Sequence, residues 1–511
     1  MQNLLWNIQR SFSKGYNDSY PPELLPDGYC AKAQNCFLEN EAIERATGCT
    51  MIANDLGSKR CLGLGSFENN VTGTKQLLSA FDNSGDAQSQ LYYWAGSGNW
   101  TLITGSDINT ADTNTEFEMA ANKIYAYNGV NSAQSWDGSA RATVAAIPVT
   151  YFMKWFHNYM FAFNHASYPS RLYFSNLLLP ETWGATDYID INPNDGDKGT
   201  ALAILGDELV LGKRNRIWSF TGWGETTWDI KTIAERITGC GIMSHRGVVN
   251  VGNDLYFISA VGGVPQIRSL TRTRYATVIS GGVIGGAANL ATTLSGLNTG
   301  QLNIAASMFD GENAWFFLPN GSDTYNSLAL RYNLPTKGWT SHTGKYASAA
   351  ITSMVTGTPI IYFGESRADS KVYKLDSSYS NNGEAIPMDF RSRTFLTTGR
   401  TGAVRPYVKS KWKYLFVTAE RTGDVDIDID ASADGYSFSD VATMNCKSQQ
   451  SVFPFTFPVK LGTTDVVRKR MNLGLTSFGC GLRFQHEVAD ETVKIREYQI
   501  GFKPRGIRAI D

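Results

Sequence analysis

The chain has 511 residues, 42% of them hydrophobic and 12% aromatic, so it is globular and can form a large core. Its 46 Lys and Arg residues nearly balance 47 Asp and Glu residues, which excludes a whole-molecule field that would recruit nucleic acid. The 49 Gly residues outnumber the 16 Pro residues, and runs of Asn, Ser, Thr and Gly separate the apolar patches. This composition favours an all-β chain rich in tight turns.

The seven cysteines form an odd number without any CxxC pair, so neither a zinc knuckle nor a disulfide framework is indicated. They are Cys30, Cys36, Cys49, Cys61, Cys240, Cys446 and Cys480. We expect all of them to be reduced and buried as small hydrophobic side chains. The N-terminal stretch lacks the apolar core of a signal peptide, and no run approaches the roughly eighteen apolar residues of a membrane span. The sequence therefore predicts synthesis and assembly in a cytoplasm.

Residues 1–52 contain no repeated unit and are predicted to form an extended N-terminal arm. Three prolines between residues 21 and 26 favour an extended backbone. A pair of strands is expected within residues 43–51, after a turn. One strand of the arm is expected to close the ring of the domain that follows, and the extended part suits contact with a neighbouring copy.

Residues 53–384 contain a degenerate repeat whose clearest copy is residues 207–230. Each copy opens with a short apolar or aromatic strand. The copies begin at Lys75, Asn122, Asn158, Asp207, Asn253, Glu312 and Pro359. Successive starts differ by roughly 36 to 59 residues, close to the forty-odd residues of a propeller blade.

Residues 207–230 alternate short apolar runs with polar or Gly-containing turns, which predicts three short antiparallel strands. About twenty-four residues cannot bury enough apolar area to offset their ordering entropy, so the unit needs copies of itself as neighbours. Most copies have a further strand that ends in Trp or another aromatic residue, which suits packing on the next sheet. We predict a β-propeller of about seven blades, with six or eight as alternatives. The competing interpretation is two or three β-sandwiches with accidental similarity.

Two segments interrupt the blade pattern. The first, residues 168–200, contains oxygen-bearing side chains that could bind calcium. They are Asn192, Asn194, Asp195 and Asp197. Their spacing does not match an EF-hand, so a solvated turn cluster is the favoured interpretation. The second segment, residues 281–300, is rich in small residues and is predicted to be an insertion or a short helix between blades.

From about residue 385 the strands lengthen and the blade pattern stops. Polar and apolar residues alternate cleanly at 413–420 and 425–430, as in a half-exposed antiparallel sheet. We predict that residues 385–511 form an independent antiparallel β-sandwich or jelly-roll-like domain. Four carboxylates occupy every second position of one strand, namely Asp424, Asp426, Asp428 and Asp430. Consecutive ones lie about 7 Å apart, too far to share one ion, so a solvated face that discourages sheet pairing is predicted.

No catalytic motif is found in the sequence. The five histidines have no HExxH partner, and GxSxG and GxxxxGK[ST] are both missing. They are His157, His165, His245, His342 and His486. We therefore expect a protein that is not an enzyme and uses no cofactor or metal. A glycoside hydrolase remains an alternative, because propellers can place carboxylates around the central channel without a local motif. So does a receptor- or glycan-binding propeller, in which Tyr168, Trp183 and Trp223 could stack on sugars.

Two regions resemble one protein family. The N-terminal pattern comprises Gly15, Asn17, Pro22, Leu24, Gly28, Ala31, Asn35, Phe37, Ile43, Arg45 and Gly48. The C-terminal segments are RKRMNLGL at 468–475 and LRFQHEVADETVKIREYQIGFKPRGIR at 482–508. Both resemble tail hub or nozzle proteins of tailed bacteriophages, a group that includes the packaged-DNA stabilisation proteins of short-tailed phages.

This resemblance implies a β-propeller with an extra β-domain, present as a hexameric ring below the portal and its adaptor. It implies a structural protein of the virion tail, assembled in the bacterial host cytoplasm. Such a ring retains packaged DNA and conducts it during ejection. The implied partners are further copies of the chain, the adaptor and portal, other tail proteins, tail fibres or spikes, and genomic DNA in the lumen.

A DNA conduit must not bind DNA tightly, because contacts from Lys and Arg to phosphates add up over every subunit. Local basic groups could still guide or hold the DNA end. The candidates are Lys213, Arg214 and Arg216, then Arg268, Arg272 and Arg274, and finally Arg468, Lys469 and Arg470. Solvated charges paired with nearby carboxylates are the competing interpretation for each cluster. We expect at most one cluster to face the channel.

Overall fold

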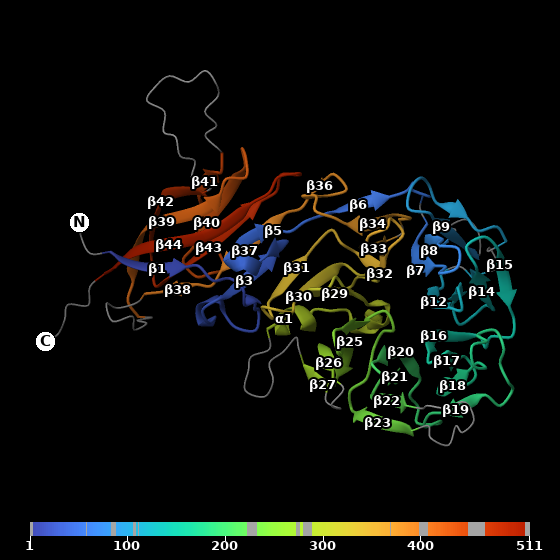
Figure 1. Cartoon of the computed structure of the whole chain (residues 1–511). Coiled ribbons are helices and arrows are strands. Elements are labelled where there is room, and N and C mark those ends of the chain that lie inside the picture. Colours follow the sequence, from blue (N-terminus) through green and yellow to red (C-terminus); the bar gives the residue numbers. More distant parts are fainter. Residues whose placement is uncertain are drawn as a thin grey trace.

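The computed structural model shows a ring of small sheets joined to a body of two larger sheets (Figure 1). It describes residues 4–57, 59–82, 88–105, 109–110, 112–221, 232–271, 276–278, 289–367, 369–397, 407–447 and 466–505. The first and last described residues, 4 and 505, lie at the far end of the two-sheet body, away from the ring (Figure 1). The part of the 281–300 segment that is described contains α1 (Ala291–Ser295), which fits the predicted short helix. Single 3-10 turns occupy Pro22–Leu24, Glu39–Glu41 and Thr299–Ile304.

Seven antiparallel blades form the ring, each built outward from an inner strand. Blade 1 comprises β7 (Cys61–Glu68), β8 (Lys75–Asp82), β9 (Gln88–Trp94) and β10 (Thr101–Leu102), with β11 (Asn109–Thr110) beside β9. Blade 2 comprises β12 (Glu116–Ala120), β13 (Lys123–Tyr127), β14 (Ala133–Trp136) and β15 (Arg141–Val144). Blade 3 comprises β16 (Thr150–Phe156), β17 (Tyr159–His165), β18 (Arg171–Phe174) and β19 (Tyr188–Asp190). Blade 4 comprises β20 (Gly199–Leu205), β21 (Glu208–Lys213), β22 (Arg216–Thr221) and β23 (Thr232–Thr238).

The remaining blades follow the same order. Blade 5 comprises β24 (Val248–Val251), β25 (Asp254–Val261), β26 (Val264–Leu270) and β27 (Ala276–Val278). Blade 6 comprises β28 (Ala306–Phe309), β29 (Asn313–Leu318), β30 (Leu328–Asn333) and β31 (Trp339–His342). Blade 7 comprises β32 (Ala347–Ser353), β33 (Ile360–Glu365), β34 (Val372–Leu375) and, from the N-terminal segment, β6 (Cys49–Ile52).

The inner strands close a ring around one axis. They follow one another as β7, β12, β16, β20, β24, β28 and β32, and β32 packs again on β7. The outer edge of blade 7 is completed by β6, which pairs antiparallel with β34. The prediction of an all-β propeller with about seven blades is confirmed, and so is the expected closing strand from the N-terminal segment.

The segments that open the sequence copies are the second strands of the seven blades, from β8 through to β33. These strands are almost wholly buried because a neighbouring blade covers each face, as in β29, where all six residues are buried. Aromatic rings stack between blades, with ring centroids 5.5 Å apart for Tyr93 and Trp136 and 6.3 Å apart for Phe317 and Phe363. Each fully buried large side chain of this kind stabilises the fold by about 1.5–3 kcal/mol.

The second body is a sandwich of two sheets. Sheet A contains β42 (Val466–Ser477), β39 (Ser410–Glu420) and β44 (Lys494–Pro504), with β1 (Leu5–Gln9) and β5 (Ile43–Arg45) on the far edge of β44 and β4 (Cys36–Phe37) beyond β5. Sheet B contains β3 (Tyr29–Gln34), β37 (Met388–Ser392), β43 (Gly479–His486), β40 (Asp426–Ser432) and β41 (Phe438–Asn445), with β38 (Phe395–Leu396) also on β43. Trp412, Phe484 and Tyr498 lie between them in one buried core. All seven cysteines of the chain are free and buried, as predicted.

The N-terminal segment joins the two bodies. Strand β2 (Gly15–Tyr16) pairs in parallel with both β31 of blade 6 and β3 of sheet B, so blade 6 and sheet B form one continuous sheet. A short hairpin of β35 (Ser380–Asn381) and β36 (Glu384–Ala385) extends blade 7 beside β6. The described part of residues 1–52 therefore supplies strands to the sandwich and to the propeller. These strands pair within their own chain, and contact of the segment with a neighbouring copy stays a prediction.

Residues of the N-terminal family pattern lie at this joint. Gly15 has φ of 79°, and a Cβ atom there would lie 2.4 Å from the backbone nitrogen of Trp339, so only glycine lets β2 approach blade 6. The Asn35 side chain donates to Thr343 and to the carbonyl of Pro387, at 2.9 and 2.8 Å. It thereby ties the end of blade 6 to the start of β37 in sheet B.

An ion cluster around the buried Asp389 fixes the centre of sheet B. Asp389 on β37 accepts hydrogen bonds from Arg483 at 2.8 and 3.2 Å and from Lys32 at 2.8 Å, with Arg391 also 3.2 Å away. Burial by itself raises the pKa of Asp389, but the hydrogen bonds from Arg483 and Lys32 outweigh it and hold the pKa at about 2. The ion cluster joins a strand of the N-terminal segment to two strands from the other end of the chain.

The Asp389 cluster predicts acid sensitivity. The pKa of Asp389 is lower in the folded state, about 2, than in the unfolded state, about 3.9, so its contribution is present above pH 4 and is lost as the pH falls towards 2. The shift corresponds to about 2–3 kcal/mol. Urea unfolding of the wild type and Asp389→Asn between pH 2.5 and 6 should show a difference that shrinks by about 2 kcal/mol on acidification, which is most of this amount. Asp424→Asn, an exposed control, should show no comparable trend, and a pH-independent difference for Asp389→Asn would contradict the assignment.

Candidate functional site

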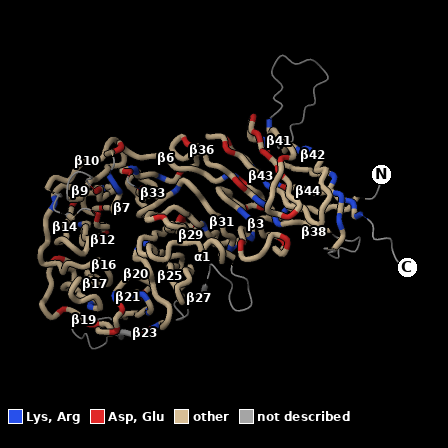
Figure 2. Tube along the Cα trace, turned by 180° about the vertical axis from the view of Figure 1, so that it is seen from behind, with Lys and Arg blue, Asp and Glu red and all other residues tan. Residues whose placement is uncertain are grey.

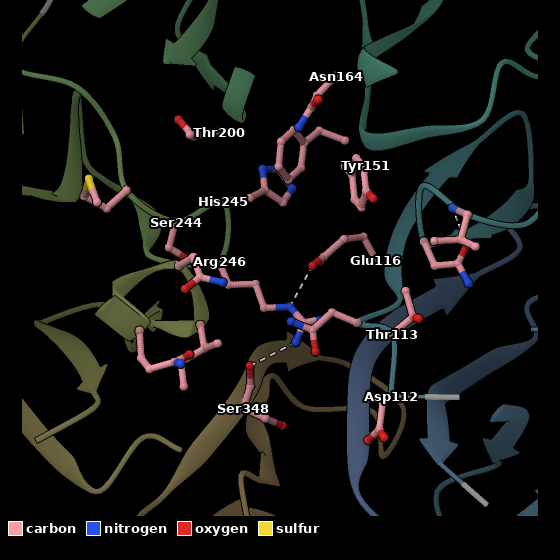
Figure 3. Close-up of a pocket in the computed structure, with 18 of the residues that line it drawn as sticks. Asp112, Thr113, Glu116, Tyr151, Asn164, Thr200, Ser244, His245, Arg246 and Ser348 are labelled. Atoms are coloured by element: carbon pink, nitrogen blue, oxygen red, sulfur yellow. Dashed lines mark hydrogen bonds and ion pairs between the residues drawn. The ribbon is translucent and has the colours of Figure 1, made fainter. Parts of the chain in front are cut away.

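A funnel surrounds the propeller axis at one face of the ring (Figure 3). Its volume is about 920 Å³, and all seven blades contribute to its wall. The wall is formed by segments that enter the inner strands and by turns between second and third strands, which meet at one face because neighbouring strands run antiparallel. Many lining side chains are amides or hydroxyls, including Asn114, Asn128, Asn164, Thr200, Gln301 and Asn303. The funnel suits binding of a polar ligand through many neutral hydrogen bonds.

Arg246 crosses the axis at the base of this funnel (Figure 3). It enters from blade 5, and its Nε donates to Glu116 of blade 2 at 2.7 Å. One terminal nitrogen donates to the carbonyl of Ser348 in blade 7 at 3.1 Å. The other donates to the carbonyls of Leu62 and Thr115 at 2.6 and 3.0 Å. A single guanidinium therefore links blade 5 to blades 1, 2 and 7 and obstructs the axis.

Gly63 on β7 makes room for this guanidinium. A Cβ atom at position 63 would lie 1.8 Å from the carbonyl oxygen of Thr115 and 3.1 Å from a terminal nitrogen of Arg246. The first distance is impossible without movement of the backbone. The glycine thus allows blades 1 and 2 to approach closely enough for both carbonyls to reach Arg246.

A second ion pair and a neutral histidine lie beside Arg246. Lys154 pairs with Glu118 at 2.7 Å, and although burial alone lowers the pKa of Lys154, the carboxylate outweighs this effect and raises it. Burial, together with the nearby Lys154 charge, lowers the pKa of His245 well below its usual value. Its Nδ1 accepts from the amide of Leu202 at 3.3 Å, so the neutral ring carries its proton on Nε2. His245 therefore acts as a hydrogen-bond donor in the funnel wall.

The funnel offers binding groups rather than free acid or base groups. Its two lining carboxylates are both ion-paired, Asp112 with Arg60 and Glu116 with Arg246. Within the described ranges, His, Cys, Asp and Glu do not gather in threes as metal ligands would. The paired carboxylates and neutral polar groups of the funnel thus favour recognition of a neutral polar ligand over general acid–base chemistry.

No helix in the described part of the chain is long and apolar enough to cross a membrane.

Lys213, predicted as a DNA contact, is fully buried. Its ammonium donates to Ser170 at 3.0 Å, to the carbonyl of Asn192 at 3.2 Å and to Asp195 at 2.8 Å. Burial alone raises the pKa of Asp195, but the Lys213 hydrogen bond outweighs it and lowers the pKa. Lys213 therefore cannot contact DNA in this fold. Its ammonium supplies the positive charge at the loop for which calcium was considered, while Asp197 accepts two backbone amides.

Lys213→Met is expected to lower the free energy of unfolding by about 2–3 kcal/mol, because it leaves the Asp195 carboxylate buried without its cation. The neighbouring control Arg214→Ala changes an exposed side chain and should stay within about 0.5 kcal/mol. Thermal unfolding of both variants, with and without 2 mM or so of added calcium, would measure this. Stabilisation of the wild type by calcium would contradict the assignment of Lys213 as the resident cation.

The other predicted cations near the blades have local partners or lie outside the described residues. Arg216 forms an ion pair with Glu235 at 3.4 Å, as the competing interpretation anticipated. Arg268 donates twice to a glutamine of its own strand, at 3.0 and 2.6 Å. Arg272 and Arg274 lie outside the described residues. None of the described members of these two clusters lines the funnel on the propeller axis.

The C-terminal cluster is exposed. Arg468, Lys469 and Arg470 lie on β42 at the edge of sheet A, and all three are solvent-exposed. Lys469 donates to the carbonyl of Thr443 in the opposite sheet at 2.7 Å. Arg468 and Arg470 alternate with it and project from the outer face of the sheet. This is the one predicted cluster whose described cations form an open surface.

The row of alternating aspartates behaves as predicted. Asp426 and Asp428 on β40 are exposed, whereas Ile427 and Ile429 between them are fully buried in the sandwich core. Asp430 is partly buried instead, and burial raises its pKa. The carboxylates thus form a solvated face of sheet B, with the apolar face turned towards sheet A.

Sequence reasoning missed the residues of the funnel. Arg246 and Glu116 are single charged residues more than a hundred positions apart, and no local pattern links them. Gly63 stands in the run Cys61 to Gly65, where glycines alternate with leucines. That alternation, shortly before the first repeated copy, was the available signal, because a glycine within a strand often marks a close approach of another group.

The observed class is an all-β protein in which a seven-bladed propeller shares a continuous sheet with a sandwich. No protein-family model and no curated protein matches the chain. Solved structures similar to it include the computationally designed Ika8 protein, with 12% identity, a TM-score of 0.39 and coverage of 64% of this chain and 100% of that one. The WD40 domain of Neurospora crassa Pan2 has 8% identity, a TM-score of 0.39 and coverage of 65% and 95%. Saccharomyces cerevisiae Sqt1 has 10% identity, a TM-score of 0.37 and coverage of 64% and 99%. This similarity is one of fold alone.

Proposed function

We propose that this protein is a structural component of the virion tail of a tailed bacteriophage. Six copies form a hub or nozzle ring below the portal and adaptor, which retains packaged DNA and conducts it during ejection. The ring is assembled in the host cytoplasm and also contacts other tail proteins, fibres or spikes. The observation that carries the proposal is the continuous sheet through β31, β2, β3 and β37, which fuses propeller and sandwich into one building block.

A continuous sheet suits a load-bearing ring element. A flexible linker between two domains permits relative motion, whereas a sheet that runs from one to the other resists it. The N-terminal residues that resemble the phage family lie at this joint, including Gly15, Asn35 and Arg45. The resemblance and the architecture therefore point to the same feature, a rigid connection between the two bodies.

DNA in such an assembly passes between subunits rather than through a propeller. Arg246 and its four hydrogen-bond partners obstruct the propeller axis, so that axis offers no conduit. A lumen lined by six copies of a chain with net charge −1 carries no strong uniform field, which suits passage of DNA without tight binding.

Native mass spectrometry and negative-stain imaging test the proposal. The purified chain, alone and mixed with the adaptor and portal of the same particle, is expected to form a ring with six-fold symmetry. A discrete monomer in both samples would overturn the proposal. Degradation of a polysaccharide by that monomer would assign the protein to the glycoside hydrolases instead.

The funnel favours one alternative function, binding of a glycan. Its rim carries Tyr151, which is 38% exposed and lies against Gly129, beside many amide and hydroxyl groups. Aromatic faces and neutral hydrogen-bonding groups together recognise sugars. Of the turn aromatics considered from the sequence, Tyr168 is 49% exposed, with Arg171 4.1 Å from its ring centroid, but it is not among the residues that line the funnel. Trp223 lies outside the described residues.

Glycan binding would be tested by screening surface oligosaccharides against the wild type, Tyr151→Ala and Tyr407→Ala. Tyr407 is exposed and distant from the funnel, so its variant is the matched control. A glycan-binding propeller should lose at least tenfold or so in affinity with Tyr151→Ala and remain unchanged with Tyr407→Ala. The tail-ring proposal expects no saturable binding by any of the three.

A further inference from the structure

The outer face of sheet A is basic. Arg468 and Arg470 on β42 and Lys411 on β39 project from it and are exposed. The carboxylates on this face already have cations of their own. Glu497 pairs with Arg10, Glu420 with Arg496, and Glu44 with Lys494. Among the residues that the structure describes, Arg468, Arg470 and Lys411 have no carboxylate within ion-pair distance. Figure 2 shows Lys and Arg gathered where the sandwich approaches the chain ends.

The same face carries aromatic and apolar side chains. Arg468 lies 5.0 Å from the ring centroid of Phe416, and Arg470 lies 4.2 Å from that of Tyr414. Trp6 packs on Phe416 with centroids 5.5 Å apart and is still 40% exposed. Ile8, two residues along β1, is 51% exposed. A sheet face that combines guanidinium groups stacked on aromatic rings with exposed aromatic and apolar side chains has the composition of a protein–protein interface core.

The opposite outer face of the sandwich is acidic along its β40–β41 edge. Lys32, Arg391 and Arg483 lie on the same face nearer its centre, around Asp389. Asp426 and Asp428 on β40 and Asp440 on β41 are exposed on sheet B. Asp426 and Asp428 accept hydrogen bonds only from neutral side chains among the described residues, Asn445 at 2.8 Å and Thr443 at 2.9 Å. One sandwich thus presents a positive face and a negative face on its two sides, and red positions mark β41 in Figure 2.

We propose that the basic face of sheet A docks on the acidic face of sheet B of the next copy of this chain. The inference rests on the proposed ring and names the surfaces that build it. A contact between two different faces is heterologous, and heterologous contacts repeat head to tail until the rotation closes a ring. The net charge of −1 means that copies do not repel one another as wholes, while the separated faces attract.

The face is large enough for such a contact. Strands β39 and β44 each have eleven residues, which at about 3.3 Å per residue gives a length of roughly 36 Å. Four strands spaced about 4.8 Å apart give a width of roughly 19 Å, hence an area of roughly 700 Å². A standard specific interface buries about 800 Å² per partner. DNA is the less suitable occupant because Trp6 and Ile8 would remain exposed beside a phosphate backbone.

Charge reversal on the two faces tests the contact. Variant one carries Arg468→Glu and Arg470→Glu, and variant two carries Asp426→Lys and Asp428→Lys. Each alone should weaken ring assembly at least tenfold or so, since like charges then meet at every contact. An equimolar mixture should restore assembly, because every contact in an alternating ring again joins opposite charges. The thermal unfolding temperature of both variants should equal that of the wild type, since all four substituted side chains are exposed.

The outcomes separate this inference from the proposed function. A wild-type ring that persists in both variants would overturn the docking surfaces and leave the ring proposal standing. A wild type that never assembles would overturn both. Variant one assembling normally while losing affinity for a 20-base-pair or so duplex would assign the basic face to DNA instead. Wild-type assembly should also weaken between 0.1 and 1 M salt, where the screening length falls from about 10 to 3 Å.

Discussion

Replacing Arg45 by Met is expected to lower the free energy of unfolding by about 4 kcal/mol, the largest single-residue loss that we predict for this chain. The side chain is fully buried, and its guanidinium donates to three backbone carbonyls. Nε and one terminal nitrogen donate to Ile386 at 3.1 and 2.8 Å, and the other terminal nitrogen donates to Val488 and Glu491. Each buried carbonyl left without a donor costs about 1–3 kcal/mol. Urea unfolding followed by tryptophan fluorescence would measure the loss.

Two controls define the cause of this loss. Arg45→Lys retains the charge but cannot donate to all three carbonyls from one planar group, so it should recover only part of the stability. Arg10→Met removes an exposed arginine of the same N-terminal segment and should cost less than about 1 kcal/mol. An effect of Arg45→Met no larger than that of Arg10→Met would mean that the joint between propeller and sandwich does not depend on this residue.

The propeller could be predicted because its signal is local and repeated. The seven sequence copies begin the second strands of the blades, where burial on both faces forces a continuous apolar run. Their spacing then gave the blade count. The alternating pattern at residues 425–430 likewise predicted a half-exposed strand, because each aspartate faces solvent and each isoleucine faces the core.

The joint could not be predicted in the same way. Strand β2 has two residues, and its partner on blade 6 lies more than three hundred positions away, so no local periodicity marks it. The three prolines between residues 21 and 26 predicted an extended arm, but they lie only in the connection between β2 and β3. The sandwich that was predicted from residue 385 onward also contains strands from the N-terminal segment. The sequence pattern after residue 385 does not show that its sheets need these additional strands.

The candidate cations illustrate why charge alone does not identify a site. Lys213 and Arg468 each belong to a cluster of three basic residues within three or four positions. Lys213 is buried in an ion pair with Asp195, whereas Arg468 is exposed on the face of a sheet. Whether such a basic residue is buried or exposed depends on residues that are distant in the sequence and pack against it. Arg246 shows the converse, since an isolated arginine binds four backbone or side-chain acceptors from three other blades.

Arg246→Leu is expected to lower the free energy of unfolding by about 3 kcal/mol. The substitution leaves the Glu116 carboxylate without its cation and the carbonyls of Leu62, Thr115 and Ser348 without a donor. Water in the funnel can replace some of these donors, which places the effect below that of Arg45→Met. Arg60→Leu at the rim of the same funnel removes an exposed ion pair with Asp112 and should cost at most about 1 kcal/mol.

Gly63→Ala should act on the same contact from the other side. The added Cβ would lie 1.8 Å from the Thr115 carbonyl, so blades 1 and 2 must separate and withdraw both carbonyls from Arg246. If the guanidinium is what links these blades, Arg246→Leu and Gly63→Ala remove one interaction between them, and their effects in the double variant should fall short of the sum by at least about 1 kcal/mol. Additive losses in a double-mutant cycle would show instead that Gly63 serves only the packing of β7 against β12, and that Arg246 holds the axis without depending on that approach.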